Sequence, residues 1–124
     1  MPIRTCRWND PGQAGDGQRI LICRYRPRAL PKAKETWDVW IPALGPSKEL
    51  HAAFYGKRGP PIGWDEYRRR YLAEIEEQRA RIEELAGRVR KGETITLLCS
   101  SACVDELHCH RALLRALIEE AVAR

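Results

Sequence analysis

The chain lacks the sequence features of a membrane-bound or secreted protein. None of its apolar runs approaches the roughly 20 residues that a membrane-spanning helix needs, and the first residues lack the apolar core of a signal peptide. We therefore expect a soluble, cytoplasmic protein without a membrane partner. The 124 residues contain no internal repeat and no low-complexity segment. That length fits one domain with a core of its own.

Cysteine is common in the chain, but not in the pattern of a disulfide-bonded protein. The five cysteines are odd in number. This fits free thiols or metal ligands in a reducing compartment better than a disulfide framework. Histidine is scarce, with three residues, yet two of them and three of the cysteines lie within residues 99–111. This segment is the first candidate for a reactive or ligand-binding site.

Positive charge is unevenly distributed along the chain. The formal net charge is +5, and residues 1–63 hold 11 of the 22 Lys and Arg but only 5 of the 17 Asp and Glu. The excess of positive charge therefore lies in the first half. It favours an anionic ligand, such as phosphate or nucleic acid, on one side of the molecule. A solubilising surface explains it equally well.

Short strands and longer helices alternate along the chain. Alternating or β-rich patterns predict strands over residues 3–8, 19–25, 36–41 and 94–99. Helical periodicity and caps predict a short helix between Ser47 and Gly56, a long helix over residues 64–90, and a last helix over residues 112–122. Strands separated by helices predict a small three-layer α/β sandwich, with a mainly parallel sheet of three or four strands in one domain over residues 1–124.

The long helical segment carries one apolar stripe. Its apolar residues recur at steps of three, four or seven between Trp64 and Val89. The helix either runs unbroken to Arg90 or breaks near Gln78, where the stripe carries a polar residue. The length of the stripe also leaves room for a homodimer contact.

Several motifs follow one another in a familiar order. They are Asp16-Gly17-Gln18-Arg19-Ile20-Leu21-Ile22, Arg26-Pro27-Arg28, Trp40 with Leu44-Gly45-Pro46-Ser47-Lys48-Glu49-Leu50, and Trp64-Asp65-Glu66-Tyr67 before Arg70-Tyr71-Leu72-Ala73-Glu74. Together they resemble the YeaO-like family of bacterial proteins, a domain of unknown function (DUF). Thr96-Leu97-Leu98-Cys99 with Cys109-His110-Arg111 looks like the cysteine-bearing branch of the same superfamily. The resemblance covers nearly the whole chain and implies a compact α/β domain, but it supplies no reaction.

The chain departs from the pattern of that family in two places. Where many relatives carry an acid before the arginine of the second strand, this chain has Cys23. Where they carry Trp-Pro-Arg-Gly, it has Arg26-Pro27-Arg28-Ala29. These changes add a thiol and make the turn more basic, and they put in doubt any role built on the missing acid.

The cysteine-rich segment links a predicted strand to a predicted helix. Open α/β proteins usually bind ligands in such loops, at the carboxyl ends of the strands. Cys109 is expected in the first turn of the last helix, with Asp105 as its cap. Helix amides attract anions there and lower the pKa of a thiol. Cys109 is thus a candidate nucleophile, with His110 as proton carrier and Arg111 as anion clamp. The alternative for Cys109, and for Cys99 at the strand end, is a small buried residue that helps to pack the helix.

A basic turn follows the second predicted strand. Arg24, Arg26 and Arg28 alternate, which places their side chains on one side if the strand geometry persists. Guanidinium groups bind phosphate and carboxylate oxygens in pairs. In a parallel sheet the arginines would face the loop that contains Cys99 and Cys109. Alternatively, they cover the core and pair with Asp or Glu.

Two other sites are conceivable in the cysteine-rich segment. Cys99, Cys103, Cys109 and His110 could bind zinc or iron, although the paired spacing of a zinc finger is missing. Cys109 and Arg115 have the spacing of a cysteine phosphatase. We interpret that spacing as coincidental, because the residues between them form a helix and include no glycine to cradle a phosphate.

The leading hypothesis is an anion-binding site at the carboxyl rim of the sheet for a phosphorylated or nucleotide-like small molecule. Its binding residues would be Arg24, Arg26, Arg28, Arg111 and Cys99, and its catalytic residues Cys109 and His110. A thiol-dependent enzyme without a cofactor is the sharper form of this hypothesis. The alternatives are a nucleic-acid-binding module and a metal- or redox-responsive Cys/His domain.

Overall fold

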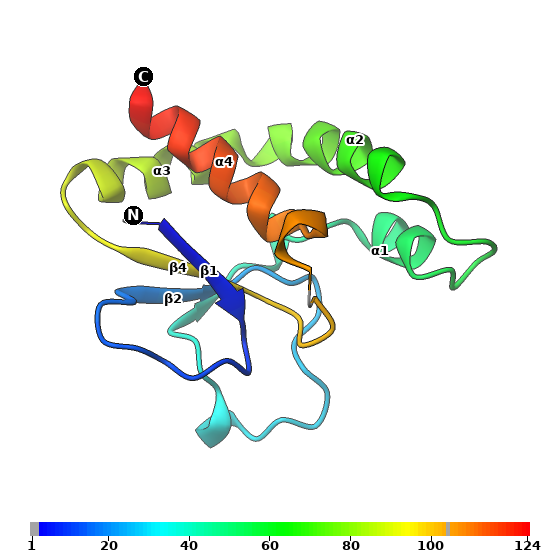
Figure 1. Cartoon of the computed structure of the whole chain (residues 1–124), viewed down its shortest axis with the longest axis horizontal. Coiled ribbons are helices and arrows are strands. Elements are labelled where there is room, and N and C mark those ends of the chain that lie inside the picture. The colour runs from blue at the N-terminus through cyan, green and yellow to red at the C-terminus, as the bar shows by residue number, and fades with distance from the viewer. Residues whose placement is uncertain (1–2, 104) are drawn as a thin grey trace.

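The computed structural model of the chain describes residues 3–103 and 105–124. Its strands are β1 (Ile3–Arg7), β2 (Gln18–Leu21), β3 (Val39–Trp40) and β4 (Ile95–Cys99). Its α-helices are α1 (Lys48–Phe54), α2 (Trp64–Ile75), α3 (Arg79–Arg90) and α4 (His110–Ala123), as Figure 1 shows. Short 3-10 helices are η1 (Lys32–Lys34), η2 (Pro42–Leu44), η3 (Glu76–Gln78) and η4 (Glu106–His108). No helix in these described residues is long and apolar enough to span a membrane.

The four strands form one parallel sheet in the order β1-β4-β2-β3. The central strand β4 is buried along its whole length. That burial explains its continuous apolar sequence, since a central parallel strand is covered on both faces. The predicted α/β class and the parallel sheet of up to four strands are confirmed.

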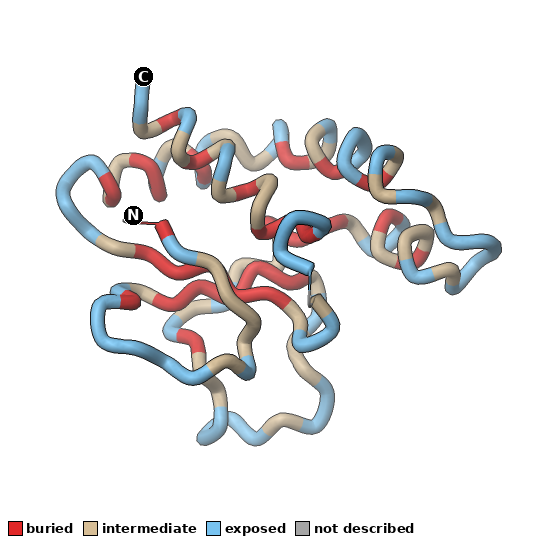
Figure 2. Tube along the Cα trace, viewed as in Figure 1, coloured by how far each residue is buried: buried red, intermediate tan, exposed pale blue. Residues whose placement is uncertain are grey.

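The two faces of the sheet are covered in different ways. The four α-helices gather on one side (Figure 1), where Ile20 and Leu97 pack with Leu114 and Ile118 of α4. The opposite face buries a smaller cluster around Leu98, which is covered by the segment after β2 (Figure 2). The third layer of the predicted sandwich is therefore extended chain with a short 3-10 helix. Two prolines, which disrupt helices, lie in that covering segment.

The second strand ends earlier than its sequence predicts. Ile22 still donates a backbone hydrogen bond to Leu98 (3.0 Å), but the chain then leaves the sheet. Gly45 crosses at this point, so closely that a Cβ added there would lie 2.5 Å from the backbone nitrogen of Arg24. The predicted strand over residues 19–25 was thus too long. Strand alternation does not extend through the arginines that follow.

The helical region after residue 63 has a break. α2 and α3 are separated by η3 at Glu76–Gln78. The long helix therefore breaks near Gln78 and does not run unbroken to Arg90. Ser47 caps α1 as predicted, because its Oγ accepts from the Leu50 amide at 3.1 Å. The Ser47 amide in turn donates to Glu74 of α2 at 2.9 Å. These contacts hold α1 against α2 beside the carboxyl ends of the strands.

Candidate functional site

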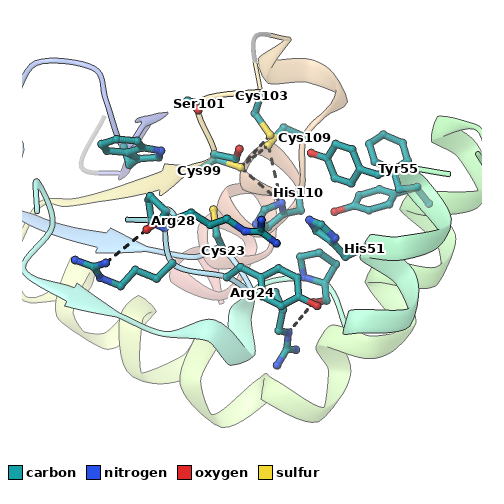
Figure 3. A pocket seen from close by; sticks show the side chains of 18 of the residues that line it. Cys23, Arg24, Arg28, His51, Tyr55, Cys99, Ser101, Cys103, Cys109 and His110 are labelled. Carbon is teal, nitrogen blue, oxygen red and sulfur yellow. Dashed lines mark hydrogen bonds between the residues drawn. The ribbon is translucent and has the colours of Figure 1, made fainter. Parts of the chain in front are cut away.

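The turn after β2 and the loop after β4 meet in one pocket at the carboxyl ends of the strands. Its volume is about 830 Å³, and Figure 3 shows the residues from both segments facing it. Arg24, Arg26 and Arg28 line it together with Cys99, Cys109 and His110. The two segments lie far apart in sequence. The structure places them side by side, as the parallel sheet predicted.

The pocket wall is basic and aromatic. Four of the described lining residues are Arg or Lys, namely Arg24, Arg26, Arg28 and Lys57, and none is Asp or Glu. The other large side chains of the wall are Trp8, Tyr25, Trp40, His51, Phe54, Tyr55, Tyr67 and His108. Cationic groups in a partly enclosed cleft focus a positive potential on its interior. The wall thus combines positive charge with flat aromatic surface.

The three arginines of the turn are occupied to different degrees. Arg24 donates from Nε to the Pro46 carbonyl at 2.8 Å. Arg26 pairs with Glu35 at 2.8 Å, as the alternative interpretation of this turn expected, and lies over the ring of Trp37. Arg28 is exposed, and among the described residues its side chain has no hydrogen-bonding or ion-pairing partner. Arg28 therefore has the most binding capacity left for a ligand.

The backbone next to Arg28 has an unusual conformation. Ala29 has a φ of 56°, in the left-handed region that glycine adopts most readily. We expect Ala29→Gly to raise the free energy of unfolding by about 1 kcal/mol, measured by urea denaturation. Ala33→Gly is the matched control, since Ala33 has no positive φ and should lose stability on substitution. Equal destabilisation by both changes would contradict the expectation.

Three sulfur atoms form a cluster at the floor of the pocket. The Sγ of Cys99 lies 3.2 Å from that of Cys103 and 3.0 Å from that of Cys109. All three sulfurs lie within 4.8 Å of one another. Cys99 and Cys109 are buried, whereas Cys103 is only partly buried at the pocket wall. Cys103 is thus the member of the cluster that a ligand reaches most directly.

His110 is fixed in one orientation beside the sulfurs. Its Nε2 lies 2.8 Å from the Ile22 carbonyl, which only accepts, so Nε2 carries the proton. Nδ1 then faces the sulfurs of Cys99 (3.8 Å) and Cys109 (4.0 Å) with a free lone pair. Burial lowers the pKa of His110, which keeps the ring neutral near pH 7. A neutral imidazole in this position can accept a thiol proton.

The negative charge of the cluster falls on Cys103. Hydrogen bonds from the thiols of Cys109 and Cys99 lower the pKa of Cys103 to about 3. Hydrogen bonding to Cys103, together with burial, raises the pKa of Cys109 and of Cys99. The physical reason is that three sulfurs in contact cannot all ionise, and the least buried one loses the least solvation.

Arg111 does not reach the pocket wall. It is 5 % exposed, and its guanidinium donates to the Cys103 carbonyl at 3.3 Å. Its Nε has no hydrogen-bond partner in the described structure. Arg111 thus holds the loop and contributes positive charge that helps to lower the pKa of Cys103. Arg111, which was expected to bind the ligand, therefore lies beneath the pocket and not in its wall.

The start of the last helix differs from its prediction in two respects: Cys109 precedes the first turn, and Asp105 is not its cap. α4 begins at His110, so Cys109 is its N-cap residue. Asp105 does not cap this helix: its side chain accepts from Leu107 at 3.1 Å and caps η4 instead. That predicted cap was wrong, because the short 3-10 helix lies between Asp105 and α4.

The sequence did not reveal the aromatic side of the pocket. His51 lies between Tyr25 and Tyr55, with ring centroids 5.0 and 4.7 Å away, and Lys57 lies over the ring of Tyr25. Tyr25 and Tyr55 are large aromatic residues that stay exposed. Tyr25 in the turn after β2 and Tyr55 directly after α1 were the available signal, but their common location required the fold.

Sequence comparison connects this geometry with known proteins. A family profile described as "Active DUF488-N3 subclade" (DUF488-N3a) matches residues 3–122. The chain belongs to the DUF488 family. It is 33% identical over 108 residues to the "Uncharacterized protein YeaO" of Escherichia coli K12. This alignment covers 87% of this chain and 90% of the relative. The predicted YeaO-like membership is confirmed.

The chain is also similar to two mycobacterial proteins. The "Uncharacterized protein Rv3073c" of Mycobacterium tuberculosis H37Rv and the "Uncharacterized protein Mb3100c" of Mycobacterium bovis are each 31% identical over 88 residues. Each alignment covers 69% of this chain and 72% of the relative. No solved structure matches the chain significantly.

Proposed function

We propose that this DUF488 protein is a thiol-dependent enzyme that acts on a small anionic molecule with a planar ring, such as a nucleotide-like compound. One observation carries the proposal. A pocket of about 830 Å³, with four cationic and no acidic lining residues, opens onto three clustered cysteines. The volume is within the range of small-molecule sites. The cationic wall binds the anionic group, and the aromatic side supports the ring.

The residues of the pocket divide into binding and reacting groups. Arg28 binds the anion, since its guanidinium has no partner among the described residues. Cys103 is the nucleophile in place of Cys109, because it is the partly buried sulfur and the one with the lowered pKa. The Cys109 thiol stabilises that thiolate by hydrogen bonding. His110 accepts and returns protons through Nδ1.

Alkylation with a limiting amount of iodoacetamide tests both parts of the proposal. Cys103 is expected to be labelled first when the reduced protein is treated at pH 6 and mapped by mass spectrometry. Adenosine monophosphate should protect Cys103 at lower concentration than inorganic phosphate or adenosine, because it offers both a ring and an anion. Cys6, a partly buried cysteine on β1 outside the pocket lining, is the internal control and should show no protection. Equal labelling of Cys6 and Cys103, or no protection by any of the three compounds, would contradict the proposal.

Metal binding is the second candidate, because three sulfurs lie within 4.8 Å of one another. Thiolates bound to tetrahedral zinc at about 2.3 Å lie about 3.8 Å apart. The separations of 3.0 and 3.2 Å here are closer to direct contact between thiol and thiolate. Elemental analysis after anaerobic, reducing purification decides between the two. One equivalent of zinc or iron per chain would favour the metal site and rule out a free Cys103 thiolate.

The nucleic-acid alternative predicts a different dependence on salt. Binding of a duplex should weaken steeply as ionic strength rises, because phosphate contacts release counterions. A pocket of the size seen here encloses a small molecule, so we expect random duplex DNA to bind weakly. Filter binding or fluorescence anisotropy between low and physiological salt measures this directly. Tight, strongly salt-dependent binding would support the nucleic-acid module instead.

A further inference from the structure

We propose that the sulfur cluster catalyses thiol–disulfide exchange, with Cys103 attacking an anionic disulfide and Cys99 resolving the mixed disulfide. This inference rests on the proposed function and names its substrate class. The three thiols are the unusual feature of the pocket, because a single nucleophile would need no second sulfur in contact with it. A dithiol reaction needs one accessible and one buried sulfur within reach of each other, and that is the arrangement found.

The geometry prepares Cys99 and Cys103 to bond. The Cys99 thiol donates to the Cys103 sulfur at 3.2 Å. A disulfide bond is about 2.05 Å long, so the two sulfurs need to approach by little more than an ångström. The Cys103 amide donates to the Ser100 carbonyl at 3.0 Å, which closes a turn between the two cysteines. Cys99 lies at the end of the buried central strand and provides the fixed partner.

The first step joins the substrate to the protein. The Cys103 thiolate attacks one sulfur of the substrate R–S–S–R′ and forms the mixed disulfide Cys103–S–S–R. The S–S bond of the substrate breaks, and R′–S⁻ leaves with the electron pair and takes a proton from solvent. Arg28 and the other cations of the wall hold an anionic group of R or R′ during this step. A lower pKa of the departing thiol makes it leave faster.

The second step releases the rest of the substrate. The Cys99 thiol gives its proton to Nδ1 of His110, which lies 3.8 Å from its sulfur. The Cys99 sulfur attacks Cys103 and expels R–S⁻, which takes that proton to become a thiol. The substrate disulfide is thereby reduced by two electrons to two thiols, and the protein dithiol is oxidised to a Cys99–Cys103 disulfide. An external dithiol, of low molecular weight or in a protein, reduces this disulfide and completes the cycle.

The probe for this reaction is 5,5′-dithiobis(2-nitrobenzoate), an anionic aromatic disulfide that releases a coloured thiol. Reduced wild-type protein is expected to release two equivalents of the coloured thiol in its fast phase and to contain a Cys99–Cys103 disulfide by peptide mapping. Cys99→Ser should release one equivalent and keep a stable mixed disulfide on Cys103. Cys103→Ser should lose the fast phase. Cys6→Ser is the control and should behave as wild type, and circular dichroism verifies that each variant is folded.

A second pair of measurements separates this inference from the proposed function. Arg28→Ala should slow the reaction with the anionic probe about fivefold and leave the rate with neutral 2,2′-dithiodipyridine unchanged. If that charge preference is found but the wild type stops at one equivalent with a mixed disulfide, exchange is overturned and the anion-binding thiolate site stands. If the two probes react alike in wild type and Arg28→Ala, and Cys103 has no fast phase, both proposals fail.

Discussion

Alkylation of Cys103 should proceed at almost the same rate at pH 5 and at pH 8. The pKa of this thiol is lowered to about 3, so the thiolate is already fully formed at pH 5. An ordinary thiol of pKa about 8.5 gains nearly a thousandfold in thiolate over the same range. The groups that lower the Cys103 pKa are the thiols of Cys109 and Cys99, His110 and Arg111, and His51 and Tyr55 also interact with its charge. The thiols of Cys99 and Cys109 stay protonated over this range, because their pKa values are raised.

The criterion in this experiment is how the alkylation rate of Cys103 changes with pH. The absolute rate is not a criterion. A thiolate of low pKa is intrinsically a weaker nucleophile than one of high pKa, which partly offsets its greater abundance. The matched control is the same protein in concentrated urea, where the contacts to Cys103 are lost and its rate should rise about tenfold per pH unit. Mass spectrometry of the Cys103 peptide after timed alkylation measures both series. A folded-state rate that rises tenfold per unit would show that Cys103 is an ordinary thiol.

Substitution of Gly45 should destabilise the protein and disturb the pocket together. A Cβ at this position would lie 2.5 Å from the backbone nitrogen of Arg24 and 2.9 Å from the carbonyl oxygen of Ile22. Those atoms belong to the backbone that leaves β2 and carries the basic turn, so they cannot move without shifting Arg28. We expect Gly45→Ala to lower the free energy of unfolding by about 3 kcal/mol, as for overpacking a rigid site. Urea denaturation measures the loss.

Gly87 offers a matched control for this change. It lies in α3, and a Cβ added there meets no atom within 4 Å. Gly87→Ala should therefore stabilise the helix by up to about 1 kcal/mol. The Ile22 carbonyl also holds His110, so Gly45→Ala should slow the reaction of Cys103 in the folded protein as well. A Gly45→Ala variant as stable and as reactive as wild type would show that the crossing beneath the pocket tolerates a side chain.

Much of the fold follows from local patterns in the sequence. The apolar run of β4 predicted a buried central strand, and Ser47 predicted the start of α1, because burial and capping are read over a few residues. The polar residue Gln78 marked one of two alternatives for the long helix, and the structure has the break there. The end of β2 was missed, since it depends on Gly45, which is distant in sequence. The role of Asp105 as the cap of η4 was missed, because a short 3-10 helix leaves no clear periodicity in the sequence.

The sequence alone determined the DUF488 character of the chain, its parallel α/β architecture, and the position of a cysteine-rich loop at the carboxyl rim, because each follows from motifs and from the order of strands and helices along the chain. Only the tertiary structure decided which sulfur has the lowered pKa and which arginine of the basic turn lacks a partner among the described residues. Those properties depend on partners brought from elsewhere in the chain. The Ile22 carbonyl that orients His110 is 88 residues away from it. Arg26 pairs with Glu35, whereas Arg28 lines the pocket without a partner among the described residues.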